Sequence, residues 1–135
     1  MITYLQGTLL LDEDDQSIGV LANGVGYQVT VSDRDRTLCG ARGRGGDIAL
    51  FTRLFCRGDG EPDTLFGFMD LNDRVVFDRM LRIPKMGPAT AMKVISALNR
   101  EQLAETILAQ NKKALVGIKG VGAKTAEALI ECLRL

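Results

Sequence analysis

An internal repeat in the second half of the chain constrains its fold more than any other feature. When Ile83–Leu98 is laid over Ile118–Leu133, at an offset of 35 residues, the two segments align without a gap. Gly87 falls on Gly122, and apolar residues recur on both sides of that glycine. A repeat of this kind predicts two copies of a unit made of a helix, a tight glycine turn and a second helix.

The turn of the second copy has the chemistry of an anion site. Gly120 and Gly122 flank Val121, so the chain can reverse there with positive φ while the valine points into the core. The amide N–H groups at the start of the next helix then face outward, where they and the helix dipole attract a phosphate. Lys124 lies in that first turn, where a cation opposes the dipole unless an anion binds. Glycine turns between helices are common, so a single one is weak evidence for an anion site. The duplication of the turn and the basic residues nearby are the stronger evidence.

The remaining apolar spacing in this half predicts further helices. One helix is predicted from Leu71 to Leu81, and Ile83-Pro84 prevents it from continuing. Pro88 suits a first helical position, and Asn99 with Gln102 forms a capping-box pattern that opens another helix. The last helix covers Ala123–Leu135.

The first half is typical of short strands. Alternating or continuous apolar residues predict strands at Ile2–Leu11, Ser17–Ala22, Tyr27–Val31, Ile48–Cys56 and Leu65–Phe68. Asn23-Gly24 predicts a hairpin turn, Leu38–Asp47 an irregular glycine-rich connection, and Arg57–Asp63 a polar loop. Five short strands favour a small barrel of the OB type. The predicted fold class is therefore an all-β barrel, residues 1–67, followed by an all-α helical domain, residues 68–135.

Charge divides along the same line. The chain has 17 basic and 17 acidic residues, a net charge of zero. Residues 1–67 carry ten acids against six arginines, a net of −4, and residues 68–135 carry a net of +4. Ile83–Arg100 holds three bases and no acid. We interpret the two halves as modules with different electrostatic roles, the second suited to an anionic partner.

Several function classes are excluded or disfavoured. The chain has no histidine, so it has neither a histidine-dependent triad nor a histidine-ligated metal. It has no phosphate-binding loop of an NTPase. The acidic run Asp12–Asp15 resembles a hard-cation site only in composition, because adjacent turn residues diverge, and we interpret it as a solvated turn. We therefore expect no catalytic residue, no metal and no cofactor.

The cysteines and the hydropathy pattern indicate the compartment. Cys39, Cys56 and Cys132 are widely spaced and form no CxxC pair, which suits free thiols in a reducing cytosol. No secretory signal and no apolar stretch of membrane-spanning length occurs. We expect a cytoplasmic protein that does not enter a membrane.

Three short motifs, in this order, carry a family resemblance. They are Gly24-Val25-Gly26-Tyr27, Leu65-Phe66-Gly67-Phe68 and Gly120–Glu127, of sequence GVGAKTAE. Together they resemble the RuvA family, which recognises Holliday junctions in bacterial recombination and repair. The first half resembles the family's OB-fold domain, and the stretch from Gly67 onward resembles its tandem helix-hairpin-helix domain. The resemblance covers essentially the whole chain.

The resemblance implies a junction-binding scaffold. Members of the family form homotetramers, and octamers on DNA, that hold a four-way junction open as a square and work with the RuvB motor and the RuvC resolvase. Their two hairpins grip minor-groove phosphates without reading sequence. Carried over by position, the DNA-binding residues are Lys85, Met86, Gly87, Pro88, Ala89 and Thr90 in the first hairpin and Gly120, Val121, Gly122, Ala123, Lys124 and Thr125 in the second. The acidic pin, which keeps the separated strands apart, falls among Asp59, Glu61 and Asp63.

Three departures from the family pattern affect this assignment. Lys85 stands where the family has the opening glycine of the first hairpin, so we expect that turn to be distorted, with Lys85 either bound to phosphate or simply solvated. The loop Arg57–Asp63 is longer than usual, which leaves the pin residue open. The sequence stops at Leu135, before the family's third, RuvB-binding domain, so contact with RuvB is in doubt. The alternative is an adaptor of the same fold that binds proteins, or duplex DNA in general, without junction specificity.

Overall fold

The computed structural model describes residues 2–134, which fall into two compact units. The first unit ends at Arg74 and the second begins at Val75. This division lies inside helix α2 (Leu71–Met80), so a continuous helix leads from one unit into the other.

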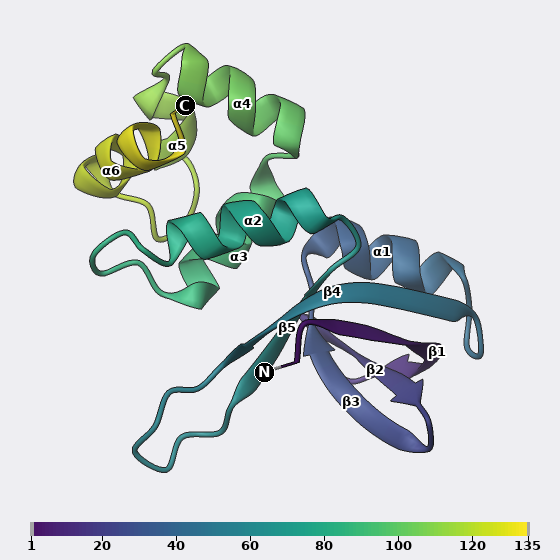
Figure 1. Ribbon diagram of the computed structural model, residues 1–135. Coiled ribbons are helices and arrows are strands. Elements are labelled where there is room, and N and C mark those ends of the chain that lie inside the picture. Colours follow the sequence, from purple (N-terminus) through teal and green to yellow (C-terminus); the bar gives the residue numbers. More distant parts are fainter. Residues whose placement is uncertain (1, 135) are drawn as a thin grey trace. The chain divides into compact units, whose positions relative to one another are not determined.

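The first unit is a closed five-stranded barrel (Figure 1). Its strands are β1 (Tyr4–Asp12), β2 (Ser17–Ala22), β3 (Val25–Thr30), β4 (Asp47–Phe55) and β5 (Thr64–Phe68). They follow the order β1-β2-β3-β5-β4 around the barrel, and β4 closes onto β1. The β3–β5 pair is parallel, with Val29 opposite Leu65, whereas the other pairs are antiparallel. The predicted OB-like barrel is confirmed.

Local sequence signals explain why the strands start and stop where they do. Asn23 and Gly24 connect β2 to β3 with φ of 50° and 81°, the left-handed conformations that a two-residue hairpin turn requires. Apolar side chains from all five strands fill the barrel, and Ile18, Val20, Val29 and Leu50 are completely buried.

One helix in the first unit was not predicted. The segment from Leu38, predicted to be irregular, instead begins with the last turn of α1 (Asp33–Ala41). The Ser32 hydroxyl caps this helix by accepting a hydrogen bond from the amide of Asp35 at 3.2 Å, and Asp33 and Asp35 lie in the first turn, where acidic residues favour the dipole. The interpretation of this part as irregular was wrong because α1 has only a weak apolar stripe. Its cap, Ser32-Asp33, was the signal in the sequence.

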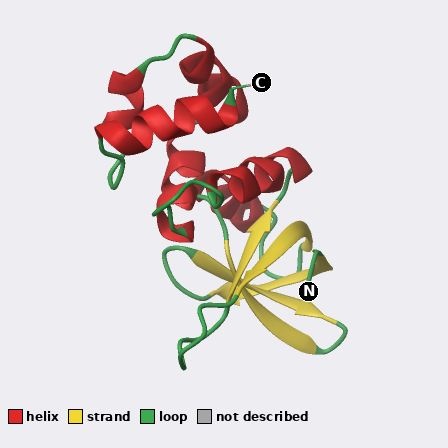
Figure 2. Ribbon diagram, turned by 60° about the vertical axis from the view of Figure 1, so that its left-hand side comes forward, coloured by secondary structure: helices red, strands yellow, loops and turns green. Residues whose placement is uncertain are grey.

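The second unit contains the remaining helices, drawn in red in Figure 2. They are α3 (Pro88–Ala97), α4 (Arg100–Leu108), α5 (Lys112–Val116) and α6 (Ala123–Leu133). Pro88 starts α3 as expected, and the capping box of Asn99 and Gln102 opens α4. The short helix α5 was not predicted, and Leu135, at the end of the expected last helix, lies outside the described residues. No helix among residues 2–134 is long and apolar enough to span a membrane.

Candidate nucleic-acid interface

The two turns of the sequence repeat share one backbone conformation. In the first, the amide of Met86 donates to the carbonyl of Ile83 at 3.1 Å, and in the second the amide of Val121 donates to the carbonyl of Ile118 at 3.0 Å. The residue before each donor is left-handed, and the residue after it is extended with φ of −92°. The repeat seen in the sequence is therefore a repeat of geometry.

Lys85 does not distort the first turn. It occupies the position of Gly120 in the second turn and adopts the same left-handed conformation, with φ of 68° against 91°. A residue with a Cβ pays about 1–2 kcal/mol for this conformation. The buried side chains of Ile83 and Met86 anchor the turn on both sides of Lys85 and hold it there. The expected distortion is thus replaced by local strain on one exposed lysine.

The helices that follow the two turns start without side-chain caps. Gly87 precedes α3 and Gly122 precedes α6, and neither has a side chain to accept the first amide hydrogens. Both glycines are exposed, and no atom lies within 4 Å of the place where a Cβ would begin. By contrast, α1, α4 and α5 are capped by Ser32, Asn99 and Asn111. The two hairpin helices therefore keep open amides that an anion can bind.

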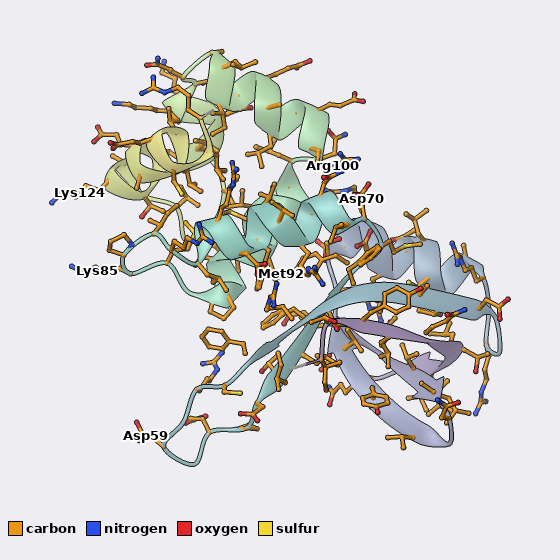
Figure 3. All side chains as sticks on the ribbon, in the orientation of Figure 1. Asp59, Asp70, Lys85, Met92, Arg100 and Lys124 are labelled. Carbon is orange, nitrogen blue, oxygen red and sulfur yellow. The ribbon has the colours of Figure 1, made fainter. Side chains whose placement is uncertain are left out.

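The lysines of the two hairpins point the same way. Lys85 and Lys124 are both exposed, and Figure 3 shows their ammonium groups projecting from the same side of the second unit. The first hairpin also lies next to the turn of the second, because a Cβ on Gly120 would be 3.4 Å from the hydroxyl oxygen of Thr90 in α3. The structure thus presents two amide sets and two cations on one surface, which we call the hairpin surface.

The other predicted hairpin residues divide by burial. Ala89 and Ala123 are exposed, and Thr90 and Thr125 are half-buried. Met86, Pro88 and Val121 are buried, so their side chains support the turns from within. Lys119, directly before Gly120, is a further exposed base that sequence reasoning missed. Its place next to the turn glycine was the available signal.

The loop of residues 57–63, which we call the acidic loop, connects β4 to β5. Asp59 has a left-handed φ of 52° between two glycines of positive φ, and the amide of Glu61 donates to the carbonyl of Gly58 at 3.0 Å, which closes the turn. Asp59, Glu61 and Asp63 are all exposed, and Figure 3 shows Asp59 at the tip of the loop. Arg57 stands over the Phe55 ring, 5.9 Å from its centre.

The acidic run near the N-terminus is a local turn. The Asp14 carboxylate accepts hydrogen bonds from the Gln16 amide and the Ser17 hydroxyl, both at 2.8 Å, and these bonds lower the pKa of Asp14. Among the described side chains, which do not include that of Asp12, no cluster of three acidic or cysteine residues could hold a metal ion, and all three cysteines are free thiols.

Comparisons with known proteins cover both units. Residues 1–67 match the RuvA N-terminal domain, and residues 77–135 match the SAM-like helix-hairpin-helix tandem. The chain is 36% identical to a Holliday junction branch migration complex subunit RuvA from Marinomonas sp. (strain MWYL1), over 99% of this chain and 64% of the relative. It is 37% identical to the RuvA subunit of Aromatoleum aromaticum, over 99% of this chain and 65% of the relative. The chain thus spans slightly less than two thirds of these relatives.

Proposed function

The chain belongs to the RuvA family, and on that premise we propose that it binds four-way DNA junctions by their shape, without reading base sequence. In this proposal it is a non-catalytic scaffold for branch migration, and the DNA-binding module is the helical half of the chain, residues 68–135. The relatives are named as subunits of a branch migration complex, so a separate motor of the RuvB type would move the DNA.

The hairpin surface is the observation that carries this proposal. Each turn offers the uncapped amides of a helix start together with a lysine, which suits one backbone phosphate at each turn. Pro88 removes one amide hydrogen from the first turn, and Lys85 adds a cation beside it. Amide and ammonium contacts to phosphate position the DNA but carry no sequence information.

The acidic loop has the complementary role. The loop carries three exposed carboxylates and one arginine, Arg57, so its net charge is negative and repels DNA phosphates. We assign the pin to Asp59, because its left-handed turn between two glycines places it at the tip. A repulsive group is useful at a junction centre, where four strands must stay apart, and has no use along a plain duplex.

Assembly and location complete the proposal. A junction has four equivalent arms, and a homotetramer would present one hairpin surface to each arm. An octamer would cover both faces of the junction. RuvB and RuvC are the proposed partners, and the cytoplasm is the proposed location.

Fluorescence anisotropy with a four-way junction and a linear duplex of the same sequence tests the function. We expect tighter binding to the junction and equal affinity for junctions of different sequence. Lys124→Glu should weaken binding to all of them by a similar factor. Arg134→Glu is a matched control, since it makes the same charge change about 15 Å farther along α6. Equal affinity for both DNA forms would refute the junction proposal and support a general duplex binder, and failure to bind either would support an adaptor that binds proteins.

A further inference from the structure

The turn between α1 and β4, residues 42–46, presents two arginines from a unit that is acidic overall. Residues 1–67 carry ten acids against six arginines, yet no acid occurs from Arg36 to Gly46. Arg42 and Arg44 are both exposed. We call residues 42–46 the arginine turn. Its charge is opposite to that of the barrel as a whole, so it is a separate feature of the surface.

The arginine turn is held firmly against the barrel. The amide of Gly45 donates to the carbonyl of Leu9 in β1 at 2.8 Å, and the amide of Leu9 donates to the carbonyl of Gly46 at 2.8 Å. A Cβ on Gly46 would lie 2.6 Å from the carbonyl oxygen of Arg42, so only glycine fits there. The turn therefore presents its side chains from a fixed backbone, which lowers the entropy lost when they bind.

Among the side chains that the structure describes, no carboxylate forms an ion pair with Arg42 or Arg44. The Nη1 of Arg42 donates to the backbone carbonyl of Asp47 at 2.9 Å. This bond orients the guanidinium but does not neutralise its positive charge. Arg44 makes no hydrogen bond or ion pair with any described side chain or backbone group. A guanidinium with free donors matches the oxygens of a phosphate better than any other side chain.

The acidic loop does not cancel this charge. The arginine turn precedes β4 and the acidic loop follows it, so the two lie at opposite ends of one strand (Figure 1). A nine-residue strand is about 27 Å long, roughly three times the ~8 Å Debye length at physiological salt. The carboxylates of the acidic loop therefore lie too far from the arginine turn to cancel its charge, although Asp47 and the acidic β1–β2 turn lie at the same end of the barrel as the arginines.

We propose that Arg42 and Arg44 contact backbone phosphates of the bound DNA, as a second phosphate site separate from the hairpin surface. This inference rests on the proposed function, because it takes DNA as the partner. The site adds affinity without sequence preference, since it reaches only the backbone.

Salt-dependent binding of the double variant Arg42→Gln/Arg44→Gln tests the inference. Anisotropy is measured with the junction and the linear duplex over a series of salt concentrations. Each lost phosphate contact should reduce the slope of log affinity against log salt by about 1, and should weaken binding on the order of tenfold at ~0.1 M salt. Arg134→Gln is the matched control and should leave the slope unchanged. Arg42→Lys/Arg44→Lys keeps both charges and should retain most of the slope.

The outcomes separate this inference from the proposed function. A double variant with the wild-type slope and affinity overturns the inference, even if Lys124→Glu still weakens binding. Equal wild-type affinity for junction and duplex overturns the junction proposal, and the slope measured on the duplex then decides the arginine contact. If the wild-type protein binds neither DNA, both the inference and the proposed function are overturned. If thermal melting shows that the double variant is unfolded, Arg44→Gln alone decides, because it removes no hydrogen bond of the fold.

Discussion

The hydroxyl oxygen of Thr90, in the first turn of α3, lies 3.4 Å from the position that a Cβ atom would occupy on Gly120. Thr90 belongs to the first hairpin and Gly120 to the turn of the second. Gly120 also has a φ of 91°, a conformation that glycine adopts without strain. The two hairpins thus lie side by side at Gly120, where the backbone conformation favours glycine and a Cβ would make an ordinary van der Waals contact with Thr90.

Gly120→Ala is expected to destabilise the protein by about 1–2 kcal/mol, because a residue with a Cβ is strained in the left-handed conformation of Gly120. Thermal unfolding measures the effect. Gly122→Ala is the control, since its φ of −92° is ordinary and its surroundings are open, and it should change stability by only about 0.5 kcal/mol. Equal losses for the two variants would contradict a cost of the left-handed conformation at position 120.

Gly122→Ser is expected to raise stability slightly and to weaken DNA binding. The serine hydroxyl can accept hydrogen bonds from the open amides of α6, which stabilises the helix by about 0.3 kcal/mol. The hydroxyl then competes with phosphate for the same amides. Melting temperature and junction affinity are measured together. Asn111→Gly is the converse control, since it removes an existing cap on α5 and should lower stability with no change in affinity. An unchanged affinity for Gly122→Ser would argue against amide contacts to phosphate.

Lys85→Gly is expected to stabilise the fold by about 1 kcal/mol and to reduce junction affinity. Glycine relieves the left-handed strain, and the change removes a cation from the hairpin surface. Gln110→Gly is a matched control, because Gln110 is also exposed and left-handed, with φ of 52°, but carries no charge. It should raise stability without changing affinity. If Lys85→Gly keeps full affinity, Lys85 is only a solvated lysine.

Asp59→Asn is expected to raise affinity for the junction several-fold and to reduce the opening of its centre. The change removes one repulsive charge, and asparagine tolerates the φ of 52°, so the loop should keep its shape. A fluorescent base analogue at the crossover reports whether the bases there are unstacked. Asp15→Asn, which removes one exposed carboxylate from the turn between β1 and β2, is the control. Unchanged fluorescence for Asp59→Asn would mean that Asp59 is not the pin.

The Asp35 carboxylate makes stability depend on pH. It is buried, it accepts a hydrogen bond from the amide of Met69 at 3.1 Å, and burial raises its pKa above the ordinary value of 3.8. The nearby Asp70 carboxylate also raises this pKa, whereas the Met69 bond, Arg34 and Ser32 oppose the rise. The native state therefore binds the proton more tightly than the unfolded state does.

Stability attributable to Asp35 should fall as pH rises from about 3.8 through the raised pKa of the folded state. Asp35→Asn should lack this fall, so the difference between the two unfolding free energies isolates it from the other carboxylates. Asp35→Ala should cost about 1–3 kcal/mol at neutral pH, because the Met69 amide loses its acceptor. If the difference in unfolding free energy between the wild type and Asp35→Asn does not change with pH, Asp35 is not the source of this pH dependence.

Much of the fold follows from patterns over a few residues. Asn23-Gly24 predicted a hairpin turn because these residues adopt positive φ cheaply, and Asn99 with Gln102 predicted a helix start because their side chains reach backbone amides nearby. Helix α1 was missed because its stabilisation lies in the Ser32 cap, and its apolar periodicity is weak.

The hairpin surface was predictable in part. The repeat identified both turns, and the identity of Gly122 indicated an open helix start. The conformation of Lys85 was not predictable, because lysine disfavours positive φ and only the buried Ile83 and Met86 impose it. The arginine turn was also missed, since its rigidity depends on hydrogen bonds to Leu9.

The sequence by itself determined the strands, the duplicated hairpins and the charge of each half, because these depend on residue type and on spacings of a few residues. Only the tertiary structure decided the parallel pairing of Val29 with Leu65, the proximity of Thr90 to Gly120 and the distance between the arginine turn and the acidic loop along β4. Each of these joins residues far apart in the chain or depends on where a strand runs in space. Such relationships form only when the whole unit packs, so they cannot be predicted from the local periodicity of the sequence.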